Sequence, residues 1–314
     1  MKKVLFICVT MLLICISGKA TERNLLLIPY PQQVSIKQGN YNLTDNVKIG
    51  ADPLFTQELK KLQEVLTEDF GLKSQIVKPS KADISLCYDA SFMQEEKEAY
   101  QLEVTDMKIT IRAQMATGIF YGIQSLRQLI KSEAGKWIIP KLTITDYPAL
   151  SWRSFMLDEG RYFKGEKVVK QILDEMALLK MNVFQWHLTD DQGWRIEIKR
   201  YPFLTEKGAW RDSTAINHPS SFSQPVFEKK RYGGYYTQEQ IREVVAYAAE
   251  HHVTIVPEID IPGHMLAALT AYPSLGCIQK GYQVGTQWGI YSDVLCAGTV
   301  SYTHLRAHET RHDL

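Results

Sequence analysis

The residues with the clearest chemical potential in this chain follow one apolar strand. The segment VTIVPEIDIPGH (253–264) begins with β-branched residues that are typical of a buried strand, and it continues into Glu258, Asp260 and His264. Carboxylates and an imidazole in such a position can bind hydroxyl groups, exchange protons or ligate a metal. The pattern is typical of an active site built at the end of a barrel strand.

Two further predicted strands, at 154–157 and 182–188, also end in polar groups. Asp158, Glu159 and Arg161 follow the first, and His187, Asp190 and Asp191 lie at the end of the second. Because active sites of parallel barrels gather at the carboxyl ends of the strands, we expect the three clusters to converge. Any one cluster could equally be a solvated surface loop, but three in the same position indicate a site.

Aromatic side chains are frequent in the same half of the chain. Aromatic rings pack on the C–H faces of sugar rings, while carboxylates and arginine bind the hydroxyls, so the mixture predicts a carbohydrate ligand. Some of these rings are equally expected in the core, Trp186 above all, because it alternates along a strand. The aromatic residues concerned are Tyr162, Trp186, Trp194, Trp210, Tyr235, Tyr236 and Trp288.

The elements that must position these groups repeat as strand, helix, strand. Apolar residues at helical spacing predict a helix over 168–179, and a capping box of Thr237 and Gln240 starts a second helix before the third strand. Such repeats indicate a parallel sheet, and the polar strand ends favour a (β/α)8 TIM barrel. About three of the eight units can be found, so we expect a partial barrel, because a complete one takes roughly 250 residues.

Residues 21–146 are expected to form a separate N-terminal α+β domain. The sequence Asp146-Tyr147-Pro148 marks its end, since proline restricts the residue before it, and the barrel then occupies 147–298. The predicted strands are 47–49, 84–88, 100–104 and 108–112, the last two as a hairpin, and helical spacing of apolar residues predicts helices over 55–70 and 119–130.

The two ends of the chain differ in composition from the rest. Residues 1–20 combine two lysines, an apolar run and small residues, which is typical of a secretory signal, so we expect export to a periplasm, an outer surface or the medium. A membrane anchor is the alternative, but no stable span is expected because the run is shorter than the roughly 20 residues that a spanning helix needs. Residues 299–314 lack the apolar pattern of the fold and are interpreted as an artefactual extension; their histidines (His304, His308, His312) would otherwise suggest a metal-binding helix face.

Charge and cysteine content narrow the function classes. The 36 Lys and Arg residues balance 35 Asp and Glu residues and do not cluster in the body of the chain, so no nucleic-acid partner is expected. Cys277 and Cys296 flank one loop and could form a disulfide in an oxidising compartment, whereas Cys87 lies in an apolar strand and is expected to be buried.

Several long motifs resemble the family 20 glycoside hydrolases, the β-N-acetylhexosaminidases. They are MLDEGRYF (156–163), NVFQWHLTDDQGWRIEIKRYP (182–202) and the stretch from YTQEQIREVV to YPSLGC (236–277), and AQMATGIFYGIQSLRQLI (113–130) resembles the last helix of the family's N-terminal domain. The likeness runs from about Ile28 to Gly298, so the chain resembles a hexosaminidase that is truncated within its catalytic barrel.

The resemblance implies a retaining glycosidase that removes terminal N-acetylglucosamine or N-acetylgalactosamine from a glycan without a protein nucleophile. The acetamido carbonyl of the substrate attacks the anomeric carbon, an Asp orients the acetamido group, and an adjacent Glu serves as acid and base. No cofactor and no metal are implied.

The same resemblance assigns roles to individual residues. Arg161 matches the arginine that binds the O3 and O4 hydroxyls, and Asp190 and His264 match the pair that supports the acid/base glutamate. Asp191 could exchange roles with Asp190. Asp260 is expected to help shape the pocket, and Trp288 is a candidate for its aromatic wall.

One departure from the family pattern concerns the catalytic pair itself. The family carries its adjacent Asp and Glu on the next barrel strand, in a segment resembling HIGGDE, and no such segment occurs in this sequence. The two Asp-Glu adjacencies present, Asp158-Glu159 and Asp174-Glu175, lie on the first strand and in a helix. We therefore expect this chain alone to be inactive.

Two alternatives remain open. A sugar-binding module or pseudoenzyme would retain Arg161 and Asp260 without turnover. An unrelated barrel hydrolase would use Asp190, Asp260 and His264 as ligands of a divalent metal and would lose activity to chelators.

Overall fold

A computed structural model of the chain describes residues 25–90, 97–217, 224–278 and 280–298. The predicted signal segment and the C-terminal tail with its three histidines lie outside these residues. In the part described, no helix has both the length and the apolar character needed to cross a bilayer.

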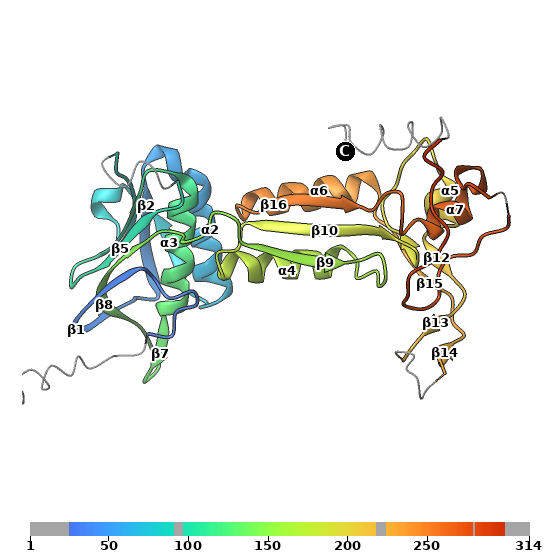
Figure 1. The fold of residues 1–314 in the computed structure, drawn as a ribbon. Coiled ribbons are helices and arrows are strands. Elements are labelled where there is room, and N and C mark those ends of the chain that lie inside the picture. The colour runs from blue at the N-terminus through green and yellow to red at the C-terminus, as the bar shows by residue number, and fades with distance from the viewer. Residues whose placement is uncertain (1–24, 91–96, 218–223, 279, 299–314) are drawn as a thin grey trace, which may run out of the picture.

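The N-terminal unit is a mixed sheet with helices on one side (Figure 1). Its strand order is β1-β8-β5-β6-β4-β2-β3, with β7 paired to β8, and the predicted hairpin is confirmed as β5 and β6. The strands are β1 (Gln33–Asn42), β2 (Asn46–Ala51), β3 (Lys73–Ile76), β4 (Ile84–Tyr88), β5 (Tyr100–Val104), β6 (Ile109–Ala113), β7 (Lys131–Glu133) and β8 (Lys136–Asp146).

The two predicted helices of this unit are confirmed as α2 (Thr56–Glu68) and α3 (Ala116–Leu129). Each places its apolar stripe against the sheet, and Leu62, Ile123 and the inward-facing strand residues Ile49, Ile84 and Leu102 are almost completely buried. Cys87, which was expected in the core, is only partly buried, because it lies near the end of β4, next to the exposed Tyr88. Short 3-10 turns, η1 (Pro53–Phe55) and η2 (Pro79–Lys81), complete the unit.

The second unit is built on three parallel strands. β10 (Val183–Asp190) lies between β9 (Ser154–Asp158) and β16 (Thr254–Ile259), and α4 (Glu166–Leu178) and α6 (Gln238–Glu250) run along this sheet (Figure 1). The Thr237 capping box is present, since the Thr237 side chain accepts from Gln240 N–H while the Gln240 side chain accepts from Thr237 N–H. This is the α/β architecture of a partial (β/α)8 barrel.

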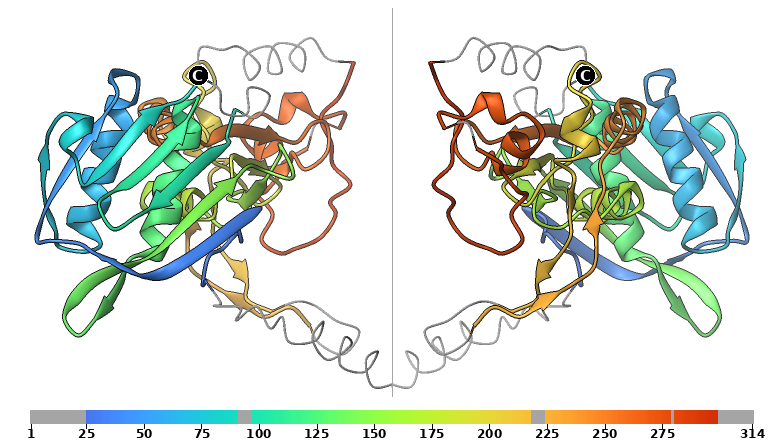
Figure 2. Two further views of the ribbon diagram at one scale, coloured as in Figure 1. Left: turned by 90° about the vertical axis from the view of Figure 1, so that its left-hand side faces the viewer. Right: turned by 90° about the vertical axis from the view of Figure 1, so that its right-hand side faces the viewer.

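A long connection between β10 and α6 forms small paired pieces beyond the strand ends (Figures 1 and 2). Its elements are β11 (Gly193–Trp194), α5 (Phe203–Glu206), β12 (Trp210–Arg211), β13 (Thr214–Ala215), β14 (Phe227–Glu228) and β15 (Tyr232–Gly233). After β16 the chain continues into α7 (Leu266–Ala271) and the 3-10 turn η3 (Pro273–Leu275).

The two units meet through a buried polar joint. α3 packs against α4, and Lys180, after α4, donates from Nζ to Asp146 Oδ2 (2.7 Å) at the end of β8 and to the Tyr100 hydroxyl (2.8 Å) on β5. The Tyr100 hydroxyl lies within hydrogen-bond distance of Asp146 Oδ2 (3.0 Å) and Ser125 Oγ (2.6 Å). Because a buried charge is costly without partners, this network constrains how the units fit together.

Candidate active site

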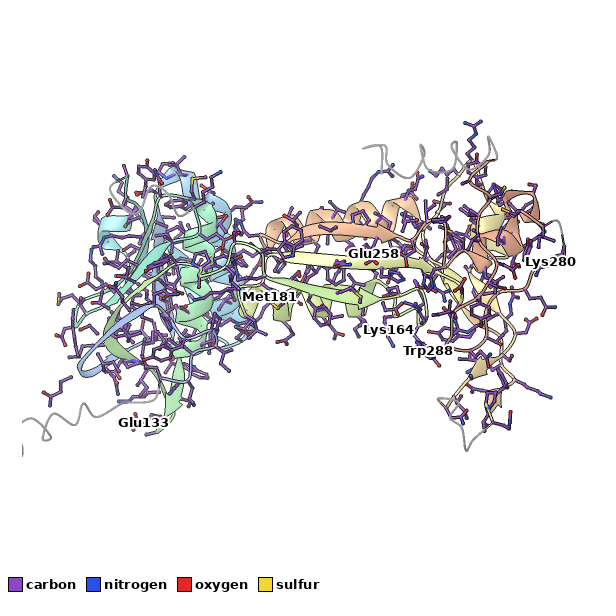
Figure 3. The ribbon with its side chains drawn as sticks, in the orientation of Figure 1. Glu133, Lys164, Met181, Glu258, Lys280 and Trp288 are labelled. Atoms are coloured by element: carbon purple, nitrogen blue, oxygen red, sulfur yellow. The ribbon has the colours of Figure 1, made fainter. Side chains whose placement is uncertain are left out.

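Strand register brings the three polar clusters of the sequence to one end of the parallel sheet. His187 on β10 is paired with Asp158 on β9 and with Glu258 on β16. The polar segments that follow these strands therefore lie beyond the same edge, on the side away from the N-terminal sheet, where Lys164 and Trp288 also lie (Figure 3). The expected convergence is confirmed for Arg161 and His264, each of which contacts Asp190.

Asp190 is the centre of this cluster, and its side chain is completely buried. Its Oδ2 atom lies 2.7 Å from Arg161 Nη2 and 3.0 Å from His187 Nε2. Its Oδ1 atom accepts the Asp191 N–H (2.6 Å) and lies 3.2 Å from His264 Nδ1. Burial alone would raise the pKa of Asp190, but the hydrogen bond with His187 and the charge of Arg161 outweigh burial, so that pKa is lowered.

Arg161 is held by two carboxylates. Besides Asp190, its Nη1 atom donates to Asp158 Oδ2 (2.9 Å), and Asp158 Oδ1 accepts the Arg161 backbone N–H (3.1 Å). Its Nε atom is buried and has no hydrogen-bond partner. About a third of the side chain remains exposed, so Arg161 is accessible although both of its Nη atoms are paired with carboxylates.

His264 contacts both acids of the TDDQGW motif, since its Nδ1 atom is also 3.2 Å from Asp191 Oδ2. Its backbone is in the left-handed region (φ 55°), which is sparsely populated by residues with a Cβ. Asp191 accepts the Leu266 N–H (3.0 Å), and burial together with the neighbouring charge of Asp190 raises its pKa. The pKa values of the two adjacent acids are thus shifted in opposite directions, and it is Asp190 that contacts both Arg161 and His187.

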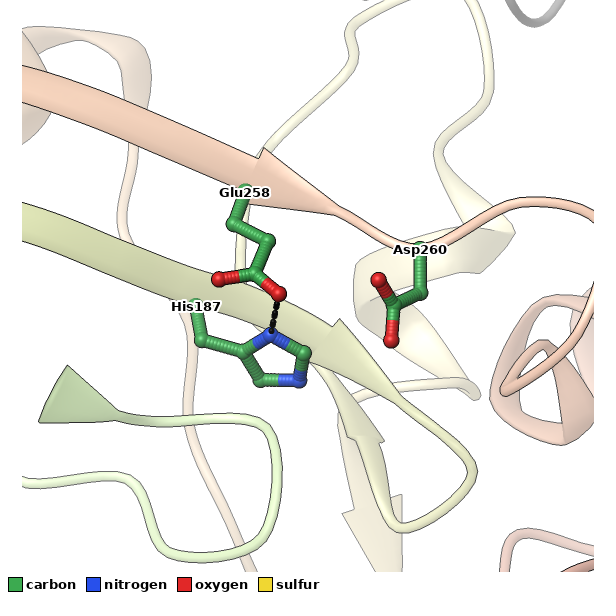
Figure 4. A group of neighbouring side chains, drawn as sticks. All are labelled: His187, Glu258 and Asp260. Atoms are coloured by element: carbon green, nitrogen blue, oxygen red, sulfur yellow. Dashed lines mark ion pairs between the residues drawn. The ribbon is translucent and has the colours of Figure 1, made fainter. Parts of the chain in front are cut away.

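A second cluster adjoins the first on the β16 side. His187, Glu258 and Asp260 bring one nitrogen and two carboxylate oxygens within 4.8 Å of one another (Figure 4). Asp190, Asp191 and His264 form the other such group. The three residues considered above as metal ligands are thus divided between the two clusters, with Asp260 in one and Asp190 and His264 in the other.

Glu159, the neighbour of Asp158, is turned into the interior. Its carboxylate accepts the Tyr236 hydroxyl (3.0 Å) and the Lys164 N–H (2.8 Å), and burial raises its pKa despite these bonds. Arg195, also buried, donates to the Glu159 and Gly160 carbonyls and so holds the loop behind Arg161. Burial lowers the pKa of Arg195 to about 10.

The remaining predicted residues lie around this centre. Asp260 approaches His187, whereas Trp288 is largely exposed on the 277–296 loop, which contacts the TDDQGW segment through Gly285 N–H to Asp191 O (2.8 Å). His187 and Glu258 were predicted only as members of the converging polar clusters, and neither was assigned a role of its own. The signal available for them was alternation, which places both on one side of adjacent strands, but their pairing depends on inter-strand register.

Comparison with known proteins gives the family. The model of the glycosyl hydrolase family 20 catalytic domain matches residues 150–307, and that of glycosyl hydrolase family 20 domain 2 matches residues 24–147. The chain belongs to glycosyl hydrolase family 20. The catalytic match of this family 20 chain runs past Gly298, so the boundary placed there stays a prediction.

Curated relatives and solved structures agree with this assignment. The chain is 35% identical to a β-hexosaminidase of Porphyromonas gingivalis over 95% of its own length and 39% of the relative, and 37% identical to one of Vibrio furnissii over 79% of the chain and 39% of that relative. It thus spans well under half the length of these two relatives. A β-N-acetylhexosaminidase of Bacteroides fragilis has a TM-score of 0.73 at 35% identity (90% of this chain, 52% of that one). A mutant Streptomyces plicatus β-hexosaminidase in complex with the product GlcNAc has a TM-score of 0.76 at 32% identity (90% and 55%).

Proposed function

We propose that the protein is a β-N-acetylhexosaminidase that acts on glycans with terminal N-acetylglucosamine or N-acetylgalactosamine. In this proposal, residues 147–298 supply the side of the active site that binds the sugar. The observation that carries the proposal is the contact of Arg161 and His264 with one buried carboxylate, Asp190, at the ends of parallel strands.

The chemistry proposed is substrate-assisted hydrolysis with retention. Arg161, with its buried Nε and its forked Nη donors, would bind two adjacent sugar hydroxyls. Asp190 and His264 would stand beside the acid/base glutamate, where an imidazole oriented by a carboxylate can tune a neighbouring pKa. The substrate acetamido group would supply the nucleophile.

We further propose that residues 1–314 alone bind the sugar without hydrolysing it. The two Asp-Glu adjacencies of the sequence are occupied elsewhere: Asp158 binds Arg161 and Glu159 binds Tyr236, while Asp174, in α4, accepts the Tyr247 hydroxyl (2.5 Å). Neither pair offers an acid and an oriented carboxylate to a sugar at Arg161.

A binding assay and a turnover assay on the same preparation test this. We expect N-acetylglucosamine to bind in a calorimetric titration, and Arg161→Lys to weaken binding about tenfold because the forked geometry is lost. Arg242→Lys on the exposed face of α6 is the matched control and should bind as the parent does. No p-nitrophenol should be released from a chromogenic N-acetylglucosaminide; robust release would contradict the inactivity of residues 1–314.

Further measurements separate the alternatives. A longer product of the same locus that hydrolyses the chromogenic substrate, with or without chelator, supports the glycosidase, whereas binding without turnover there indicates a sugar-binding module. Loss of turnover on adding chelator would favour the metal hydrolase. Export is proposed from residues 1–20, and N-terminal sequencing of the mature protein tests it.

A further inference from the structure

His187 lies at the point where three strands bring charged groups together. It is on the central strand β10, in register with Asp158 on β9 and Glu258 on β16, so the three side chains face the same side of the sheet. The His187 side chain is only 4% exposed. Figure 4 shows its ring next to the Glu258 carboxylate, with the Asp260 side chain to one side of both.

Both ring nitrogens of His187 face carboxylates. Nε2 is 3.0 Å from Asp190 Oδ2, and Nδ1 is 3.1 Å from Glu258 Oε1, an ion-pair distance without the alignment of a hydrogen bond. A neutral imidazole has one N–H, so it would present a lone pair to one of these carboxylates. A doubly protonated ring presents an N–H to each.

The charges around the ring favour the protonated form. Asp158 from β9, Asp190 from β10, and Glu258 and Asp260 from the β16 segment face it, against one cation, Arg161, whose Nη1 is 3.4 Å from Nε2. Burial alone lowers the pKa of His187, but the hydrogen bond with Asp190 and the charges of Asp158 and Glu258 outweigh it, and the net pKa is raised.

We infer that His187 is a positioning residue for the sugar-binding arginine, held as an imidazolium between Asp190 and Glu258. Asp190 Oδ2 is in contact with both His187 Nε2 and Arg161 Nη2. The imidazolium therefore holds this carboxylate oxygen in the position where it binds the Arg161 guanidinium. The expected effect on sugar binding rests on the function proposed above, but the protonation and the arginine position do not.

The stabilising contribution of His187 depends on pH. The folded-state pKa of His187 lies above its unfolded value, so its stabilising contribution is complete below the unfolded value and is lost as pH rises through the folded one. Arg161 should therefore be held most firmly while His187 is protonated and should loosen as the pH rises through the folded-state pKa of His187.

Imidazole nitrogen NMR on the 15N-labelled protein tests the protonation. At neutral pH both ring nitrogens of His187, assigned with His187→Gln, should carry protons, whereas those of His251 should not, because burial lowers its pKa. A pyridine-like nitrogen on His187 at pH 7 would overturn the inference. Loss of the Nδ1 proton on adding one equivalent of Zn²⁺ would also overturn it, because His187, Glu258 and Asp260 would then form a metal site.

The Arg161 Nε–H resonance tests the positioning without sugar. Rotation of the guanidinium should be slow in the parent at neutral pH, and it should become fast in His187→Gln but not in His251→Gln. If His187→Gln does not fold, the same change in the parent on raising the pH through the His187 titration decides the question. A guanidinium that stays rigid while His187 loses its proton contradicts the positioning role.

Sugar affinity is the last readout. The dissociation constant for N-acetylglucosamine should increase about tenfold in His187→Gln, the effect of losing one charge-assisted hydrogen bond in the network, and stay unchanged in His251→Gln. If the parent binds no sugar while the NMR results hold, the proposed function fails and the positioning of Arg161 stands. Unchanged affinity in His187→Gln would show that the positioning is irrelevant to the ligand.

Discussion

The carboxylate of Asp190 has to satisfy two imidazoles and a guanidinium within a completely buried side chain. The backbone at Gly160 packs directly against Asp190, and a glycine leaves the space for this close approach. A Cβ built on Gly160 would lie 2.8 Å from Asp190 Cβ and 3.2 Å from its backbone nitrogen. The glycine of the LDEGR segment is therefore explained by packing against the central acid.

Gly160→Ala should displace Asp190 and weaken both the fold and the site. We expect a loss of about 1–3 kcal/mol in the free energy of unfolding, as for overpacking in a dense core, together with weaker N-acetylglucosamine binding. Gly281→Ala is the control, because nothing lies within 4 Å of its Cβ position. Thermal unfolding and calorimetric titration of the two variants would compare them, and equal behaviour would refute the packing argument.

The 277–296 loop contacts the TDDQGW segment and is closed at its ends by a bridge between Gly276 and Leu295. Gln192 Nε2 donates to Gln287 O (2.9 Å), so the loop supports the backbone that carries Asp190 and Asp191. Cys277 and Cys296 directly follow the two bridge residues. Both are thiols in the structure, and each thiol interacts with the other.

Oxidation by a small-molecule disulfide such as oxidised glutathione should join Cys277 to Cys296, with release of two glutathione thiols. Closing a loop of this length should stabilise the fold by about 3 kcal/mol relative to the reduced protein. Peptide mass mapping without reduction would identify the bond, and Cys87, on β4, should remain a thiol as an internal control. Separate Cys277 and Cys296 thiols after this treatment would count against the bond.

The elements predicted from periodicity were found with small differences in their bounds. α2, α3 and α6 were recognisable because each carries a regular apolar stripe, and β9, β10 and β16 because each is a short apolar run. β1 was not identified, since most of its residues are exposed and its C-terminal half carries little apolar character. β12 and β15 are two-residue pieces that exist only through pairing across a long connection, which local sequence does not encode.

In the site, too, some features follow from local sequence and others depend on how the strands pair. Arg161, Asp190 and His264 could be predicted to meet, because strand ends of a parallel sheet share an edge. The bridging of Asp190 and Glu258 by His187 depends on register and rotamers, and was not predicted. Trp288 stays a prediction, since its side chain is largely exposed on the 277–296 loop.

The two units of the protein are joined by Lys180, Asp146 and Tyr100. The Lys180 side chain is 7% exposed, and burial lowers its pKa although Asp146 opposes that shift. Removing one partner of such a pair leaves the other charge buried without compensation, which costs more than the pair itself contributes.

Lys180→Met should therefore lower the free energy of unfolding by about 3 kcal/mol, and adding Asp146→Leu should recover part of the loss. Urea unfolding followed by circular dichroism measures both. Lys37→Met, which removes an exposed pair with Glu103, should change stability by less than about 1 kcal/mol. If Lys180→Met were as mild as Lys37→Met, the joint would contribute little to holding the units together.

β10 is paired on both sides, so it should unfold locally less often than its two neighbours. In the part of the chain that the structure describes, β9 and β16 each pair with β10 and with no other strand of that sheet. Amide protons of β10 should therefore exchange with solvent deuterium most slowly, and outward-facing amides of β9 and β16 much faster. Asp190 and His187 would then sit on the most persistent strand, whereas Glu258 lies on β16 and Arg161 and Asp260 lie on the segments that directly follow β9 and β16. The complete cluster would therefore exist only in the fraction of molecules in which both outer strands are paired with β10.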